Sequence, residues 1–182
     1  MSLMWGGNLP GEKMAGWIED VITAGYEGVA TFENDLLRFT EQTDFVKRIE
    51  DYGLGLASVD LRIDDNFDRV NRVCEVMQRL GAKHLVTLGG VAKKGANTDE
   101  IARLLNQIGE IALTYGVHAC YHNHTNDTGE TLEETEELLR KTDPELFFGF
   151  LDVGHATKDF VGHPTEQRAA IFLERNWDRI DF

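Results

Sequence analysis

Apolar positions along the chain alternate between blocks with helical spacing and short continuous runs. Between Pro10 and Gly25 the apolar residues recur every three or four positions, which predicts a helix that begins near the proline and ends at the glycine. The next run, residues 26–32, is mostly apolar and is followed by Glu33-Asn34-Asp35. A run of this length with polar residues after it is typical of a strand buried on both faces.

The same alternation continues with a period of roughly 30 residues. The predicted strands span residues 3–5, 26–32, 54–61, 84–88, 117–124 and 147–152, and residues 179–182 resemble the start of one more. The predicted helices between them are one over 35–52, one with Val70, Val73, Cys74 and Met77 on one face, one with Ile101, Leu104, Leu105, Ile108 and Ala112, one that begins at Thr131, and one after Pro164. Such regular alternation predicts a parallel sheet covered by helices.

Two parallel architectures fit this order, an open doubly wound sheet and a β/α barrel. Polar residues follow many of the predicted strands, whereas no glycine-rich nucleotide-binding turn is present, and this distribution favours the barrel. We therefore predict one α/β domain over residues 1–182, a parallel TIM barrel with about six to seven of eight βα units. Because a whole barrel typically needs about 250 residues, we expect a fragment of a longer polypeptide or a chain that associates into a homo-oligomer.

Composition narrows the classes of partner. The net charge is −14, which opposes binding to nucleic acid or to an anionic membrane surface. No apolar run is long enough to span a membrane and the N-terminus lacks a signal-peptide pattern, so we expect a soluble cytoplasmic protein. Cys74 and Cys120 are too few for a disulfide framework, and buried reduced thiols are expected.

The segment Tyr121-His122-Asn123-His124 places two imidazoles at the exit of a predicted buried strand. Residues two apart on a strand point to the same side, so His122 and His124 are candidates to bind one metal ion or to act as acid and base on a hydroxyl. Asn123 is a candidate for substrate binding. A structural role as a hydrogen-bonded loop residue is the alternative for each of the three.

A second candidate is Leu151-Asp152-Val153-Gly154-His155, in which an apolar strand ends in a carboxylate and a histidine follows three residues later. Asp152 is a candidate ligand for a divalent ion, and His155 for the metal or a substrate oxygen. The alternative is that Asp152 caps a following helix and that His155 is a loop residue. Trp5 and Glu33, each at a predicted strand end, are further candidates to contact substrate.

Taken together, four segments resemble the xylose isomerase-like barrel family, which includes inosose dehydratases, hydroxypyruvate isomerases, ketose 3-epimerases and endonuclease IV. These segments are Tyr121-His122-Asn123-His124, Gly129-Glu130-Thr131, Thr142-Asp143-Pro144-Glu145-Leu146 and Leu151-Asp152-Val153-Gly154-His155. The resemblance is specific from about residue 113 to 164 and only general before it.

The resemblance implies a divalent metal at the barrel mouth, manganese first, with magnesium, cobalt or zinc as alternatives. It implies that Asp152 is a metal ligand and that His155 contacts metal or substrate. Where many members have a glutamate ligand, this chain has His122, as in the inosose dehydratase-like branch. The base is then Glu130 or the pair His122 and His124, and Glu130 has a helix-start role as its alternative.

The implied reaction is proton abstraction next to a carbonyl, leading to isomerisation, epimerisation or dehydration of a small sugar, polyol or keto-sugar. Two other functions stay open. An apurinic-site endonuclease shares the motif, but it needs a basic surface that a charge of −14 does not supply. A non-catalytic sugar-binding barrel would keep a polar cleft without holding a metal.

Overall fold

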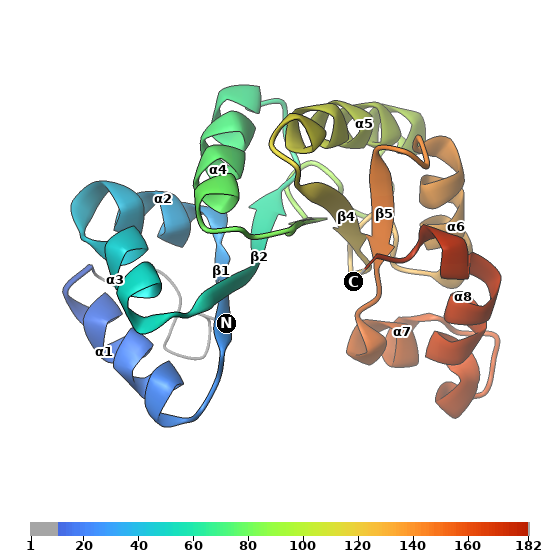
Figure 1. Cartoon of the computed structure of the whole chain (residues 1–182). Coiled ribbons are helices and arrows are strands. Elements are labelled where there is room, and N and C mark those ends of the chain that lie inside the picture. The colour runs from blue at the N-terminus through green and yellow to red at the C-terminus, as the bar shows by residue number, and fades with distance from the viewer. Residues whose placement is uncertain (1–10, 182) are drawn as a thin grey trace.

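The computed structural model describes residues 11–181 and places five parallel strands in one sheet of order β1-β2-β3-β4-β5. Their bounds are β1 Gly28–Phe32, β2 Gly55–Arg62, β3 His84–Leu88, β4 His118–His122 and β5 Phe147–Phe150. Each strand pairs with the next one along the chain, and together they follow an arc whose outer side is covered by helices (Figure 1). The predicted parallel β/α architecture of the TIM-barrel class is confirmed.

Helices connect the strands and cover the sheet. Their bounds are α1 Gly11–Thr23, α2 Glu33–Gln42, α3 Phe45–Tyr52, α4 Phe67–Arg79, α5 Thr98–Thr114, α6 Leu132–Lys141, α7 Val153–Asp159 and α8 Arg168–Asn176, with short 3-10 turns η2 Thr165–Gln167 and η3 Trp177–Arg179. Beyond η3, Ile180 forms a parallel bridge with Gly149 of β5. This bridge agrees with the strand predicted to begin at residue 179.

Three predicted elements need correction. The single helix over 35–52 is two helices, because Thr43 adopts an extended conformation and its hydroxyl accepts a hydrogen bond from the amide of Phe45 at 3.1 Å. The strands β4 and β5 end two residues earlier than predicted, at His122 and Phe150. The helix α7 follows β5 directly; periodicity predicts no helix there, and α7 agrees with the alternative in which Asp152 caps a following helix. The strand over 3–5 and the candidate residue Trp5 lie outside the described residues.

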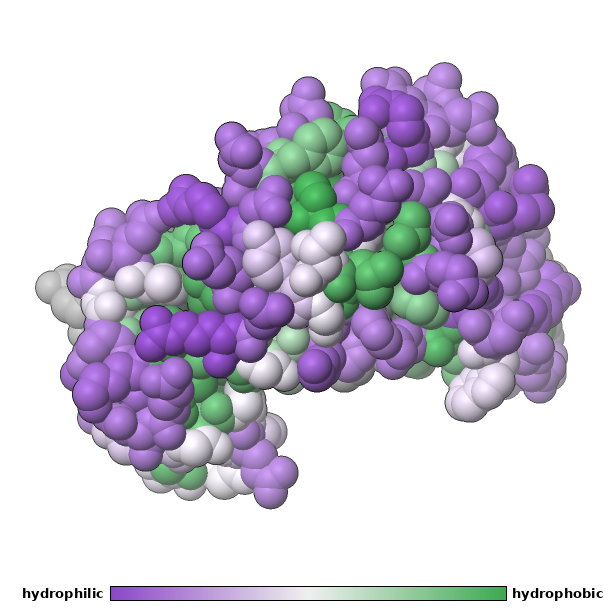
Figure 2. Space-filling view, turned by 45° about the horizontal axis from the view of Figure 1, so that its top comes forward, coloured by the Kyte–Doolittle hydropathy of each residue, from purple (hydrophilic) through white to green (hydrophobic). Residues whose placement is uncertain are grey.

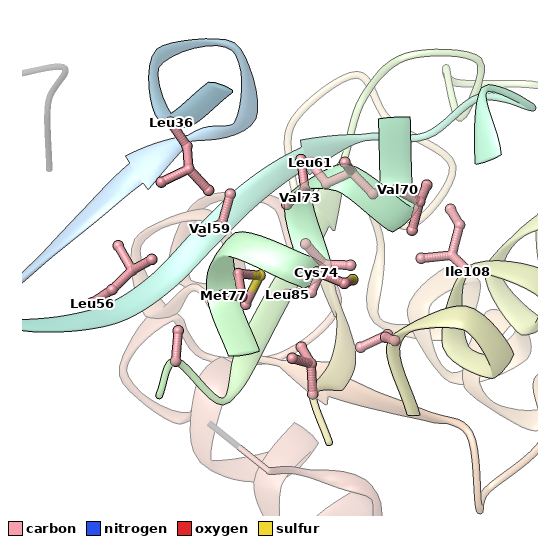
Figure 3. Packing of buried hydrophobic residues seen from close by; sticks show 14 of the residues in the cluster. Leu36, Leu56, Val59, Leu61, Val70, Val73, Cys74, Met77, Leu85 and Ile108 are labelled. Carbon is pink, nitrogen blue, oxygen red and sulfur yellow. The ribbon is translucent and has the colours of Figure 1, made fainter. Parts of the chain in front are cut away.

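The main core fills the space between the sheet and the helices. Its side chains interdigitate from β2, β3, α2, α4 and α5 (Figure 3): Leu36, Leu56, Val59, Leu61, Val70, Val73, Cys74, Met77, Leu85 and Ile108. Both cysteines are buried and free, as expected, and burial raises the pKa of the Cys74 thiol to about 12. A smaller apolar cluster, which includes Phe160 and Phe172, joins α7 and α8 at the other end of the arc.

Hydrophilic side chains cover most of the face seen in Figure 2, and apolar groups are confined to smaller patches within it. Among residues 11–181, no helix is both long enough and apolar enough to cross a membrane.

The contact between α5 and the segment before β5 depends on a glycine. A Cβ atom placed on Gly109 would lie 2.6 Å from the carbonyl oxygen of Leu146, which belongs to rigid backbone. We expect Gly109→Ala to lower the free energy of unfolding by about 1–2 kcal/mol, because this overpacking outweighs the helix-propensity gain of alanine. In the control Gly16→Ala, on α1, no atom lies within 4 Å, and a gain of about 0.5–1 kcal/mol is expected. Urea denaturation of both variants measures the difference, and equal effects would contradict this packing argument.

Asp60, near the end of β2, is a carboxyl group with only 7% of its surface exposed. Burial raises its pKa from 3.8 to about 6, so the folded chain binds this proton more tightly than the unfolded chain. Its contribution to stability is therefore fully present below about pH 4 and is lost as the pH rises through 6. We expect Asp60→Asn, which cannot ionise, to be more stabilising at pH 8 than at pH 5 by about 1 kcal/mol. Denaturation midpoints at both pH values test this, with Asp65→Asn in an exposed loop as the control; a pH-independent effect of Asp60→Asn would contradict it.

Candidate functional site

The candidate site lies where β4 and β5 end side by side. In the parallel register His122 pairs with Phe150, and the two rings stack with centroids 5.4 Å apart. The next residues are joined by a reciprocal clamp: the Asn123 side chain donates to the carbonyl of Asp152 at 3.1 Å and accepts from its amide at 2.8 Å. The buried amide of Asn123, a predicted substrate contact, thus holds the backbone that carries Asp152.

His122, Asp152 and His155 form a cluster in which one potential ligand atom of each lies within 4.8 Å of the others. The Nε2 atom of His122 is buried and has no hydrogen-bond partner among the described residues. It lies 3.7 Å from Oδ2 of Asp152, which is too long for a hydrogen bond. An unpartnered imidazole nitrogen facing a carboxylate is a donor set that suits a divalent transition metal.

Burial also determines the charge of His122. It lowers the pKa of this imidazole to about 4, against the opposing effect of Asp152. His122 is therefore neutral at pH 7 and does not form an ion pair with Asp152. A metal ligand must be the neutral imidazole, so the environment holds His122 in the state that coordination requires.

Asp152 has a second, structural contact. Its Oδ1 atom accepts a hydrogen bond from the amide of His155 at 2.7 Å and caps α7. The capping role considered as an alternative is thus present, while Oδ2 is directed to His122. The cap also starts the helical turn that carries His155. The capping role of Asp152 is therefore compatible with its place in the cluster with His122 and His155.

His124 lies just beyond β4 and completes a group of three imidazoles. Its ring centroid is 4.2 Å from that of His155 and 5.8 Å from that of His122. Its Nδ1 atom is 2.8 Å from the carbonyl oxygen of Thr125. Because a carbonyl can only accept, Nδ1 carries a proton, and in the neutral ring the lone pair then lies on Nε2.

A cavity of about 550 Å³ borders His124 and extends across the carboxyl ends of β1, β2 and β3. It is lined by Phe32, Glu33, Asn34, Asp35, Asp60, Arg62, Leu88, Gly89, Gly90, Lys93, His124 and Asp127. Its rim is shaped by Gly90, where a Cβ atom would lie 2.1 Å from the carbonyl oxygen of Ile63. Carboxylates, cations and backbone together provide both donors and acceptors, which suits a ligand with several hydroxyl groups.

Of the two glutamates that are candidates from the sequence, Glu33 lines the cavity and Glu130 is not among its lining residues. Glu33 lines the cavity at the start of α2, buried 3.2 Å from Nε of Arg69, and burial raises its pKa while Arg69 opposes the rise. Glu130 pairs with Lys94 and accepts from the amide of Asn126 at 3.2 Å. None of the Glu130 contacts in the described part of the chain involves the three histidines. The hydrogen bond from Lys94 lowers the pKa of Glu130, which makes it a weaker base.

Asp60 and Asp127 line the cavity without a role assigned to them from the sequence. In the sequence, Asp60 is one of several polar residues near the ends of predicted strands. Asp127 accepts a hydrogen bond from the amide of Gly89 at 2.8 Å, and burial raises its pKa. Nothing in the sequence near Asp127 identifies it, because its partner is 38 residues away and the two meet only through strand pairing.

Comparisons with known proteins agree with this architecture. An inosose dehydratase from Mesomycoplasma hyopneumoniae strain 7448 is 26% identical over 160 residues, covering 76% of this chain and 52% of that protein. An inosose dehydratase from Lactiplantibacillus plantarum is 44% identical over 57 residues, covering 31% of this chain and 19% of that protein. The chain thus spans about half the length, or less, of these curated relatives.

Two solved structures match a larger share of this chain than these curated relatives do. A D-allulose 3-epimerase from Methylomonas sp. superposes with a TM-score of 0.75 at 16% identity, covering 98% of this chain and 68% of that one. The probable 3-DHS dehydratase AsbF from Bacillus anthracis has a TM-score of 0.74 at 14% identity, covering 92% and 65%. At these identities the likeness concerns the fold.

A family model described as the xylose isomerase-like TIM barrel matches residues 18–181. This match runs through all five strands and includes the ends of β4 and β5 with their histidines and carboxylate. The chain therefore belongs to the xylose isomerase-like TIM barrel family.

Proposed function

We propose that this chain forms the β4 and β5 part of the active site of a divalent-metal-dependent enzyme that removes a proton next to the carbonyl of a keto-sugar or keto-polyol. The observation that carries the proposal is the buried, unpartnered Nε2 of His122 beside Oδ2 of Asp152 and the ring of His155. The names of the relatives support the substrate class, since they include an inosose dehydratase and a D-allulose 3-epimerase.

In this proposal the chain's own residues divide the work. Asp152 and His122 hold the cation, with His155 as the third ligand or a contact to a substrate oxygen. The bound cation, manganese first, would polarise the substrate carbonyl and so acidify the neighbouring C–H bond. The Nε2 lone pair of His124, at the cavity, takes that proton. Returning the proton to carbon or oxygen gives an epimer or isomer, and loss of hydroxide from the next carbon gives dehydration.

The cavity beside His124 supports a polyhydroxylated ligand. Asp127 and Asp60 offer carboxyl oxygens as acceptors, and Lys93 offers a cationic donor. The net charge of −14 supports a small molecule over DNA as the substrate. A small keto-polyol such as inosose is therefore the substrate class that we propose.

The metal-binding part is tested by titrating Mn²⁺ into the metal-free protein by calorimetry. We expect Asp152→Asn to weaken Mn²⁺ affinity at least tenfold, because the amide oxygen still caps α7 but the charge is lost. The control is Asp44→Asn, which makes the same change at the N-cap position of α3, far from the histidines in sequence. Equal affinity in Asp152→Asn and the parent would contradict the assignment and favour a sugar-binding barrel without metal.

The catalytic part is tested by assaying Mn²⁺-loaded protein on inososes, ketohexoses and hydroxypyruvate. We expect His122→Ala to lower kcat on the accepted substrate by about 100-fold, since a metal ligand next to the reacting carbonyl is removed. His163→Ala, a histidine outside the cluster, should leave kcat unchanged. If His122→Ala keeps the parent rate, His122 has a structural role only. The product of the active substrate separates isomerase, epimerase and dehydratase.

A further inference from the structure

Thr125 contacts two of the three imidazoles, one through its backbone carbonyl and the other through its hydroxyl group. The backbone carbonyl of Thr125 faces Nδ1 of His124 at 2.8 Å, and its hydroxyl oxygen faces Nδ1 of His155 at 3.0 Å. The same hydroxyl donates to Oδ2 of Asp159 and accepts from Nζ of Lys158 at 2.8 Å. Thr125 thus lies between the loop after β4 and the helix α7.

The hydrogen-bonding capacity of a hydroxyl group allows only one arrangement of protons here. A hydroxyl has one proton to donate and two lone pairs. The Asp159 carboxylate can only accept, so it takes the threonine proton, and the ammonium of Lys158 can only donate, so it uses one lone pair. His155 Nδ1 meets the remaining lone pair and must therefore carry a proton, so in the neutral ring the lone pair of His155 lies on Nε2.

The geometry of α7 makes Asp159 part of the same unit. Asp159 follows His155 by four residues, so both side chains lie on one face of the helix, and Nδ1 of His155 is 3.7 Å from Oδ2 of Asp159. The Asp159 side chain is largely buried, with 11% of its surface exposed. Thr125 bridges the gap between these two groups, because its hydroxyl contacts both.

We infer that Thr125 and Asp159 are positioning residues that hold His124 and His155 with the proton on Nδ1 and the lone pair on Nε2. Histidines that bind metals or move protons commonly have the other ring nitrogen fixed by such a partner. Here Thr125 fixes both rings: its backbone carbonyl holds His124, and its side-chain hydroxyl holds His155. The use of these lone pairs for metal or substrate rests on the proposed function; the tautomers themselves do not.

The test is nitrogen-15 NMR of the imidazole side chains in the metal-free protein, at a pH high enough to keep the rings neutral. Peaks are assigned with single histidine substitutions. In the parent, both His124 and His155 are expected to carry their proton on Nδ1. A proton on Nε2 of His155 in the parent overturns the inference without any variant.

Two variants of Thr125 separate the contact of its hydroxyl with His155 from the contact of its carbonyl with His124. Thr125→Val keeps the backbone carbonyl and the side-chain shape but removes the hydroxyl. His155 should then lose its single tautomer while His124 keeps its own, which also reports that the loop is still folded. Thr125→Ser should restore the parent spectrum of His155. An unchanged His155 in Thr125→Val, or a failure of Thr125→Ser to restore it, overturns the inference.

A parallel titration with Mn²⁺ distinguishes this inference from the proposed function. If both are right, Thr125→Val weakens Mn²⁺ binding about tenfold and Thr125→Ser does not. If the predicted tautomers are observed but neither the parent nor any variant binds Mn²⁺, the proposed function fails and the positioning role stands.

Discussion

Parallel pairing between β4 and β5 is the constraint on which the rest of the site depends. Parallel neighbours need a covering crossover, and α6 provides it, so both strands end at the same edge of the sheet. The register that pairs His122 with Phe150 then brings the residues after each strand face to face. A shift of one residue would turn His122 away from this side of the sheet. The reciprocal hydrogen bonds between Asn123 and Asp152 secure that register at the strand ends.

Burial next to this edge sets the chemical state of the polar groups. Removing an imidazole from water disfavours its charged form, and removing a carboxyl group disfavours its ionised form. His122 is accordingly neutral at pH 7, while the pKa of Asp60 is raised to about 6 and that of Asp127 is also raised. Each of these groups lowers stability relative to a fully solvated one. The burial of apolar side chains in the core, which includes residues of β2 and β4, offsets that cost.

The side chains of the candidate site come from two segments, the loop after β4 and the helix α7. The loop after β4 carries His124, Thr125 and Asp127, and the helix α7 carries His155 and Asp159. Asp152 couples them, since one oxygen caps α7 and the other faces His122. Thr125 couples them again through its contacts with His155 and Asp159. The imidazole cluster is therefore held from two sides, next to a cavity formed by the ends of three other strands.

The sequence by itself determined the alternation of helices and strands, the parallel fold class and the segments that carry His122 and Asp152. These features are local, because apolar periodicity and the residues at strand ends depend only on short stretches of the chain. Apolar periodicity predicts neither the break at Thr43 nor the start of α7 after Asp152, since both depend on side-chain hydrogen bonds. Only the tertiary structure decided that Asn123 clamps Asp152, that Lys94 holds Glu130, and that Asp127 and Thr125 belong to the site. Their partners are 29 to 38 residues away along the chain, and contacts over such separations arise only when strands pair and place their ends together.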